Sequence, residues 1–311
     1  MSIDRDTITK AAHRIAPFVR KTPVMDVTLD GVAQPVTLKL ELFQHSGSFK
    51  ARGAFNNLAE APVAPAGVTT ASGGNHGAAV AYAARTLGHR ARIFVPEIAS
   101  PAKVSRIASY GAEVVQTGAN YYEALAACEA HIAQSGARDV HAYDTEATLQ
   151  GQGTLARELE DQAPGLDTLL VAVGGGGLIG GIAAWYQSSV KVVGVEPQSC
   201  NTLHAALAAG ERVAVKPSGV AADSLGASTV GRLMFGIARD HIAGVAVVSD
   251  DDIRNAQRRL WLDQQLVTEP GGATAFAALL SGAYKPEKDE RVGVIVCGAN
   301  TTMDAFGKLF A

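Results

Sequence analysis

The sequence predicts an α/β protein with parallel-rich, twisted sheets flanked by helices, and three observations lead to this fold class. Short β-branched runs alternate with longer helical stretches along almost the whole chain of 311 residues. Several of the β-branched runs are apolar on both faces, which is typical of parallel strands covered by helices on each side. The 33 glycines and the hydrophobic content of 47% suit a compact protein rich in turns.

Eight segments are predicted as strands, with helices between them. The strands are residues 37–42, 67–72, 91–96, 112–118, 168–173, 190–196, 245–250 and 291–298. The helices include 77–88 and 251–265, and Ser249 and Asp250 precede the second of these as capping residues. The amino-terminal segment MSIDRDTITKAAHRIAPF is polar and helical, unlike a signal peptide. No internal repeat or low-complexity linker appears, so we expect any second lobe to be an insertion in the sheet.

Composition excludes several classes of partner. The net charge is −3, from 27 basic and 30 acidic residues without a basic block, so nucleic-acid binding is not expected. No apolar run reaches about 18 residues, which argues against a membrane protein. Cys128, Cys200 and Cys297 lie far apart without a CxxC pair, which indicates a reducing compartment and neither disulfides nor a zinc site. The composition therefore predicts a cytoplasmic enzyme.

The strongest local motif is LLVAVGGGGLIGGIAAW, in which a strand, four glycines (Gly174–Gly177) and a helix follow one another. The N–H groups of such a loop can surround an anion at the positive end of the helix. Gly175, Gly177 and Gly180 also satisfy G-x-G-x-x-G, and Glu196 ends the next strand about 21 positions after Gly175. This segment alone predicts an NAD-dependent dehydrogenase, with a phosphate cup for a smaller cofactor as the alternative.

Two further turns follow predicted strands. In TTASGGNHGAAVAYA, the segment from Ser72 to His76 can present N–H groups to a carboxylate at a helix start. Taken alone, Asn75 could equally be a turn residue and His76 a capping or supporting group. In VIVCGAN, Cys297 ends a strand, where a lone cysteine is usually a small buried hydrophobe. Parallel strands bring such residues to the carboxyl edge of a sheet, where open α/β folds bind ligands.

A lysine, Lys50, stands among small and apolar residues in SGSFKARGAF. With this stretch and the motifs above in order, the chain resembles the pyridoxal-phosphate (PLP) dependent serine/threonine dehydratase family, which includes serine racemase. The blocks that carry the resemblance over essentially the whole length are LKLELFQHSGSFKARGAF, SGGNHG, VPEIASPAKVSRIASYGAEVV, GQGTLARELE, VGGGGLIGG, VGVEP, VTEPGGATAFAAL and VIVCGAN.

The resemblance implies a two-lobe architecture, called fold type II among PLP enzymes and similar to the tryptophan synthase β subunit. It implies a large PLP-binding domain of residues 1–66 and 145–311, and a small mobile domain of residues 67–144. The cofactor is expected between the two lobes. Relatives usually form homodimers, so a homodimer is expected here as well.

The resemblance also assigns roles. Lys50 matches the lysine that binds the cofactor covalently, Phe49 a ring beside the cofactor, and Asn75 the partner of its 3-oxygen. Gly174, Gly175, Gly176, Gly177 and the N–H of Leu178 match the phosphate cup, and Cys297 matches the residue that faces the pyridine nitrogen. The substrate-binding positions are Ser72, Gly73, Asn75, His76 and Asp223.

These residue types suit an elimination. A lysine with its ordinary pKa of about 10.4 is a poor nucleophile, and apolar surroundings around Lys50 favour the neutral amine, which can also take the α-proton. A thiol with a pKa of about 8.5, as at Cys297, is mostly neutral and cannot keep the ring nitrogen protonated. The weaker electron sink favours fast loss of a β-leaving group. We therefore predict dehydration and deamination of L-threonine or L-serine to a 2-oxo acid and ammonia, with PLP as cofactor.

The chain departs from the family pattern at several positions. Gly73 stands where serine racemase has a second serine, so racemisation is not expected. A cation site of relatives falls on Glu196, Cys200 and Thr202, which leaves Glu196 as a weak candidate ligand and no predicted metal. Glu196 could instead cap a helix or pack between the lobes. Ser224 adds a side chain in a turn that reads ADG in the family, and this narrows the pocket.

Other interpretations remain open at this point. The substrate could be hydroxyaspartate or phenylserine, or the enzyme could act like serine racemase. A different class is the dehydrogenase that the glycine pattern predicts, and a third is a non-catalytic protein of the same fold that binds a small molecule.

Overall fold

The computed structural model describes residues 3–311. Met1 and Ser2, which belong to the predicted helical amino terminus, lie outside the described residues. The strands are β1 (Val24–Val27), β2 (Val36–Lys39), β3 (Val68–Ala71), β4 (Ala91–Val95), β5 (Glu113–Gln116), β6 (Arg138–Asp139), β7 (Thr168–Ala172), β8 (Lys191–Pro197), β9 (Ile242–Val248) and β10 (Val292–Ile295). The eight predicted strands all form, with ends displaced by about three residues at most. The prediction misses β6, which is only two residues long, and the edge strand β1.

The helices alternate with these strands. They are α1 (Arg5–Ile15), α2 (Lys50–Ala59), α3 (Asn75–Thr86), α4 (Pro101–Ser109), α5 (Tyr121–Ser135), α6 (Glu146–Gln162), α7 (Gly177–Tyr186), α8 (Thr202–Ala209), α9 (Ala222–Leu225), α10 (Arg232–His241), α11 (Asp250–Gln264), α12 (Pro270–Leu280) and α13 (Met303–Gly307). Ser249 is the N-cap of α11, and its side chain forms a capping box with Asp252, while Asp250 is the first helical residue. Within residues 3–311, no helix is long and apolar enough to cross a membrane.

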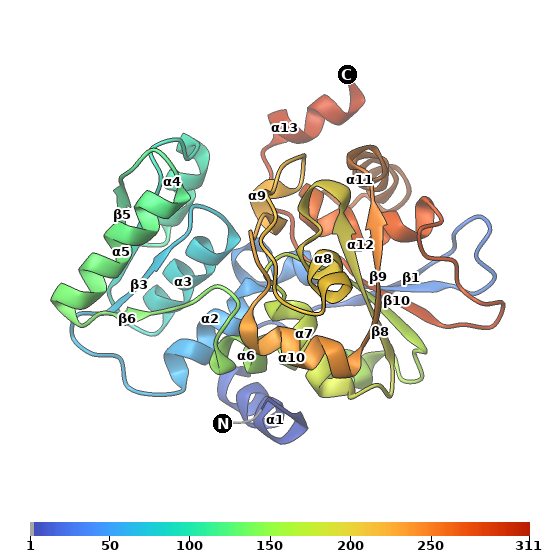
Figure 1. The fold of residues 1–311 in the computed structure, drawn as a ribbon, viewed down its shortest axis with the longest axis horizontal. Coiled ribbons are helices and arrows are strands. Elements are labelled where there is room, and N and C mark those ends of the chain that lie inside the picture. Colours follow the sequence, from blue (N-terminus) through green and yellow to red (C-terminus); the bar gives the residue numbers. More distant parts are fainter. Residues whose placement is uncertain (1–2) are drawn as a thin grey trace.

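The described strands form two separate sheets. The larger has the order β1-β2-β10-β7-β8-β9 and is parallel except for β1, which pairs antiparallel with β2. The smaller has the order β5-β4-β3-β6 and is parallel throughout. Figure 1 shows the two sheets side by side, the smaller one with α3, α4 and α5 around it. Its strands all lie between residues 68 and 139, so the smaller sheet is inserted between β2 and β7 of the larger one.

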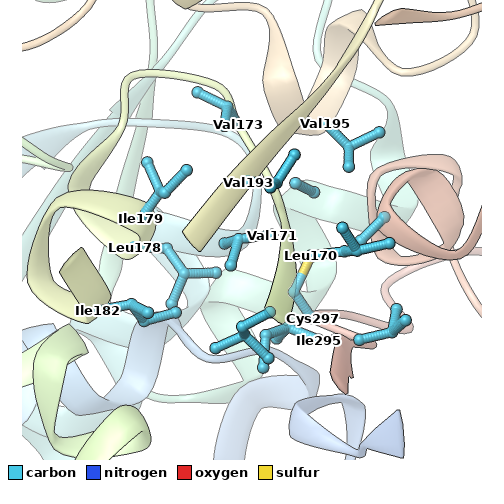
Figure 2. Close-up of a cluster of buried hydrophobic side chains, with 14 of the residues drawn as sticks. Leu170, Val171, Val173, Leu178, Ile179, Ile182, Val193, Val195, Ile295 and Cys297 are labelled. Carbon is cyan, nitrogen blue, oxygen red and sulfur yellow. The ribbon is translucent and has the colours of Figure 1, made fainter. Parts of the chain in front are cut away.

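The main core lies around the larger sheet. Its central strand β7 is buried at every residue, as expected of a parallel strand covered on both faces. Helix α12 packs against β7, β8 and β10, and α7 packs against β7 and β8. Helix α7 is buried along its whole length because α6 and α10 also pack on it. Figure 2 shows the aliphatic side chains of this region, including Val171 and Val193 from the sheet and Ile179 and Ile182 from α7.

Four charged side chains, three of them buried and Glu158 partly exposed, connect the start of α2 to the sheet. The Arg52 guanidinium donates to Glu41 over 2.9 Å and 2.7 Å and to Glu158 of α6 over 3.0 Å. Lys39, at the end of β2, also pairs with Glu158. Burial alone would raise the pKa of Glu41, but Arg52 and Lys39 hold it below its ordinary value. The four charges therefore compensate one another in a place that excludes water.

Removing Arg52 from this network leaves the Glu41 carboxylate buried without its ion-pair partner. For Arg52→Met we expect the free energy of unfolding to fall by about 3–5 kcal/mol, because Glu41 stays in the interior without its guanidinium. Urea unfolding followed by circular dichroism measures the change. The matched control is Arg259→Met, which breaks a solvent-exposed pair with Asp263 and should shift the midpoint little. Equal effects of the two substitutions would contradict a special role of the buried network.

Candidate active site

Three segments meet at the carboxyl edge of the larger sheet. Strands β2, β10 and β7 are parallel neighbours, so the segments that follow them emerge side by side. Lys50 follows β2, Cys297 follows β10, and the glycine loop follows β7. The N–H of Phe49 donates to the carbonyl of Cys297 over 3.1 Å, and Ser48 forms a β-bridge with Gly298. These bonds tie the lysine segment to the cysteine segment.

The three segments border a common cavity. It is lined by Phe49, Lys50, Asn75, Tyr143, Ala172, Gly174, Gly175, Gly176, Gly177, Leu178, Ser224, Leu225, Glu269, Gly271 and Cys297. All the residues that the sequence assigned to the cofactor thus line one space, although they come from distant parts of the chain. Tyr143, Glu269 and Gly271 are additions that the sequence did not indicate.

Lys50 is the first residue of α2 and is partly buried. Its amine donates to the carbonyl of Ala142 over 2.9 Å, and the Phe49 ring centre lies 5.2 Å away. Burial lowers the pKa of Lys50 to about 8, because the charged form loses its hydration. Helix α2 packs directly on α6 at this point, since a Cβ at Gly151 of α6 would lie only 2.7 Å from the Arg52 carbonyl oxygen. A side chain at position 151 would push α2 away from α6.

The glycine loop presents the positive end of a helix to the cavity. Gly176 precedes α7 with a φ of 88°, a left-handed conformation that favours glycine. No side chain caps the start of this helix, so its first N–H groups remain available to an anion. Together with the amine of Lys50 and the apolar Leu178, this arrangement fits a cofactor that carries both a phosphate and an aldehyde.

Cys297 lies in apolar surroundings at the bottom of the same cavity. The side chain is 4% exposed, and its Sγ donates to the Gly271 carbonyl over 3.3 Å. Figure 2 shows the sulfur beside Leu170 and Ile295. Burial raises the pKa of this thiol far above its ordinary value. The side chain is therefore a neutral thiol at any physiological pH, as the sequence predicted.

Asn75 is oriented by two short hydrogen bonds. Its Nδ2 donates to Oε1 of Glu269 over 2.6 Å, and its Oδ1 accepts from Nδ2 of Asn300 over 2.6 Å. One N–H of the Asn75 amide remains free to face the cavity. Glu269 is 4% exposed, and burial raises its pKa to about 7. Sequence reasoning missed Glu269, although its place before Pro270 is a typical helix start.

The segment from Ser72 to His76 lies at the start of α3, as predicted. Gly74 precedes the helix without a side-chain cap, and Ser72 Oγ accepts from the Gly74 N–H over 3.3 Å. The His76 ring turns away from this loop, because its Nε2 pairs with the Val140 carbonyl at 2.6 Å. Burial lowers the pKa of His76 to about 3, so the ring is neutral. The predicted contact of His76 with a substrate is therefore limited to its backbone N–H.

Gly73 and Asp223, two of the predicted substrate-binding residues, line a cleft beside the cavity. Asp223, on α9, lines a space together with Gly73 and Gly74 and forms an ion pair with Lys103 of α4. This ion pair connects α9, beside the larger sheet, to α4, beside the smaller sheet. Ser224 lines the cofactor cavity itself, and a Cβ at Gly271 would lie 2.3 Å from its Oγ. Its hydroxymethyl group therefore occupies space in the pocket, as the sequence indicated.

Glu196 serves as a helix cap. Its carboxylate accepts from the N–H groups of Leu203 and His204 at 2.8 Å each and from the Thr202 hydroxyl at 3.2 Å. The side chain is fully buried, so it cannot hold the ribose of a dinucleotide, and the capping interpretation holds. Among residues 3–311, no group of three or more His, Cys, Asp or Glu side chains is placed to hold a metal ion.

Known proteins resemble this chain in sequence and in structure. The family described as pyridoxal-phosphate dependent enzyme matches residues 15–298. Phenylserine dehydratase of Ralstonia pickettii is 38% identical, over 98% of this chain and 95% of that protein. The catabolic L-threonine dehydratase of Escherichia coli is 33% identical, over 98% of this chain and 95% of that one. The structure of maize serine racemase superposes with a TM-score of 0.94 at 32% identity, covering 100% of this chain and 97% of the other.

The lowered pKa of Lys50 can be measured through cofactor binding. When PLP is added to protein stripped of cofactor, we expect the rate at which yellow absorption appears to rise about tenfold per pH unit up to pH 8 and then to level off. The reason is that only the neutral amine attacks an aldehyde, and its fraction saturates above the pKa of about 8. Lys50→Ala should give no such absorption. A rate that still climbs beyond pH 9.5 would show an ordinary lysine.

Proposed function

The chain belongs to the family of pyridoxal-phosphate dependent enzymes, and we propose that within this family it acts on L-threonine and L-serine. It is an ammonia-lyase that works by β-elimination. A β-hydroxy amino acid loses water, and the resulting imine is hydrolysed to a 2-oxo acid and ammonia. One observation carries the residue assignment: the partly buried Lys50 amine, the anion-binding loop and the neutral Cys297 thiol line a single cavity.

Lys50 is the proposed base. When bound, the cofactor withdraws electrons from Cα and so makes the α-proton acidic. Because burial lowers the pKa of the Lys50 amine to about 8, the neutral form that can accept this proton becomes the major form only above about pH 8, well below the range of an ordinary lysine. Cys297 contributes by remaining neutral, which avoids the strong electron withdrawal that a carboxylate partner would support. In this arrangement loss of the β-hydroxyl follows directly on loss of the α-proton.

The loop before α3 is the proposed carboxylate site. The N–H groups of Asn75 and His76 lie at the positive end of α3 and can orient the substrate carboxylate toward Lys50. Ser72 supports the turn through its bond to the Gly74 N–H. Gly73 carries no proton donor for the opposite face of Cα, which favours elimination over racemisation. Asp223 closes the cleft through its ion pair with Lys103.

The remaining cofactor residues have simple roles. Phe49 would pack beside the cofactor ring, and the Asn75 amide that Glu269 and Asn300 orient would donate to its 3-oxygen. Gly174–Gly177 with the N–H of Leu178 would hold the phosphate. No step in this proposal requires a metal at Glu196, whose oxygens cap α8.

We further propose how the whole protein is organised. Residues 67–144, which contain the smaller sheet, form a small mobile domain, and residues 1–66 and 145–311 form the large PLP-binding domain. The division is supported by the two separate sheets in Figure 1. A cytoplasmic homodimer fits the composition and the resemblance to dehydratases.

The central test is a substrate panel. We expect purified enzyme with PLP to release 2-oxo acid and ammonia from L-threonine and L-serine, and Lys50→Ala to reduce kcat by at least about 100-fold because the base is lost. The assay couples 2-oxo acid to a colorimetric hydrazone and measures ammonia independently. Added NAD should have no effect. Full activity of Lys50→Ala would show that this lysine takes no part in the reaction.

Gly73 offers a gain-of-function test. A Cβ at this position meets only ordinary contacts, the nearest being Ala99 at 3.6 Å, so serine fits. We expect the native enzyme to form no D-serine from L-serine, and Gly73→Ser to form measurable D-serine by supplying an acid on that face. Chiral chromatography measures the product. Gly74→Ser, one position on and also sterically open, is the matched control. D-serine production by the native enzyme would refute this interpretation of Gly73.

A further inference from the structure

The turn that leads to Lys50 is strained at a residue other than glycine. Ser46 has a φ of 58° and a ψ of 10°, and Gly47, which follows it, has a φ of 75°. Two consecutive residues are therefore left-handed, a conformation that a serine adopts only at a cost. Ser46 is buried, and its Oγ has no hydrogen-bond partner within residues 3–311, so its own side chain does not hold the turn. A conformation of this kind persists where the surrounding structure imposes it.

Two side chains from different parts of the fold impose this conformation. The carbonyl of Ser46 accepts from Nη2 of Arg106 over 3.1 Å and from Nδ2 of Asn300 over 2.9 Å. Arg106 belongs to α4, beside the smaller sheet, whereas Asn300 follows β10 of the larger sheet. The carbonyl that they share lies four positions before Lys50. Both parts of the protein thus hold the same peptide group, just ahead of the lysine.

These two side chains lie directly on the turn. A Cβ at Gly47 would come closer than 3.0 Å to both Oδ1 of Asn300 and Nη2 of Arg106, so the turn has no room for a side chain there. Nε of Arg106 and Oδ1 of Asn300 are themselves buried and without a hydrogen-bond partner in the part of the chain that the structure describes. Unpaired buried polar atoms beside a left-handed serine lower stability, and such features gather at functional sites.

The residue before Ser46 is held from the same side. The Tyr82 hydroxyl is hydrogen-bonded to Nδ1 of His45 at 3.0 Å, and the two rings stack with centres 4.9 Å apart. Tyr82 belongs to α3, which packs against α4. Helices α3 and α4 thus contact two successive residues of the lysine segment, His45 and Ser46.

The Asn300 amide connects the turn to the cofactor side of the cavity. Its Nδ2 donates to Oδ1 of Asn75 as well as to the Ser46 carbonyl, and Asn75 lines the cavity. Past the turn, the Phe49 N–H is bonded to the segment after β10. Since only three residues separate Ser46 from Lys50, a change in the turn displaces the start of α2. The position of α4 and the direction of the lysine are therefore linked through bonded neighbours.

We propose that Arg106 is a positioning residue, which keeps the turn left-handed by holding the Ser46 carbonyl and so aims Lys50 into the cavity. The inference rests on the proposed function, in which Lys50 binds the cofactor. Arg106 acts on the lysine through the backbone of the turn. As a consequence, Lys50 is correctly placed for PLP only when the helices of the smaller sheet lie against the lysine segment as they do in this structure.

The test measures PLP binding, which does not depend on turnover. We expect Arg106→Met to raise the Kd for PLP about 10-fold, because Ser46 relaxes toward an ordinary conformation once its carbonyl loses the guanidinium. Glycine adopts the left-handed conformation without this cost, so adding Ser46→Gly to Arg106→Met should bring the Kd back to within about threefold of the native value. The single variant Ser46→Gly completes the double-mutant cycle. Absorbance titration of cofactor-free protein with PLP gives each Kd.

The matched control is Arg85→Met. Arg85 of α3 is exposed and also donates to a carbonyl, that of Ser109, but both residues belong to the smaller sheet's side. Its loss should leave the Kd for PLP within about twofold, because it does not contact the turn.

The pH dependence of PLP attachment is a second measurement. In Arg106→Met the pH at which the rate levels off should rise above 8, because a displaced lysine is better hydrated and its pKa moves back toward the ordinary value. In the double variant with Ser46→Gly the levelling should return to the native pH.

The outcomes separate positioning from packing and from the proposed function. Rescue by Ser46→Gly, with Arg85→Met unaffected, supports the inference. Native-like PLP binding by Arg106→Met overturns it, and so does a loss that persists in the double variant, because a purely structural defect would not respond to position 46. Native protein that binds PLP at Lys50 but releases no 2-oxo acid from L-threonine or L-serine overturns the proposed function alone. Native protein that binds no PLP overturns both.

Discussion

The buried charges beneath α2 constrain the geometry on which the site depends. Arg52 stands two residues after Lys50 on the same helix, and it is held by Glu41 and Glu158, which come from the segment after β2 and from α6. Placing these ions in the interior is costly, and the cost is offset only while all partners stay in register. The network therefore fixes where α2 begins, and with it the direction in which the lysine enters the cavity.

A single physical effect acts on Lys50 and Cys297, two of the ionisable groups that line the cavity. Loss of hydration disfavours the charged form of any side chain, so it lowers the pKa of Lys50 and raises that of Cys297. Cys297 is then neutral at physiological pH, and Lys50 loses its charge at a lower pH than an ordinary lysine does. The positive end of α7 adds a site in the cavity where a negative charge can bind. Burial, helix orientation and sheet topology thus act on the same few side chains.

Several misinterpretations of the sequence share one cause. The spacing from Gly175 to Glu196 satisfies a dinucleotide pattern, but the carboxylate is turned inward to cap α8. His76 lies in the predicted loop, yet its ring pairs with Val140, 64 residues away in the chain. Glu269 escaped notice although it orients Asn75, because the two are 194 positions apart. In each case the side chain's direction depends on a partner that no local pattern reveals.

The sequence by itself determined the alternation of strands and helices and the glycine loop, and through the family resemblance it indicated the residues that we propose hold the cofactor, because β-branched runs, helix periodicity and ordered motifs are local properties. Only the tertiary structure decided that these motifs surround one cavity, since that depends on β2, β10 and β7 being neighbours. It also decided the direction in which burial shifts the pKa of Lys50 and of Cys297. Burial and proximity arise from packing between distant segments, and the linear chain does not contain them explicitly.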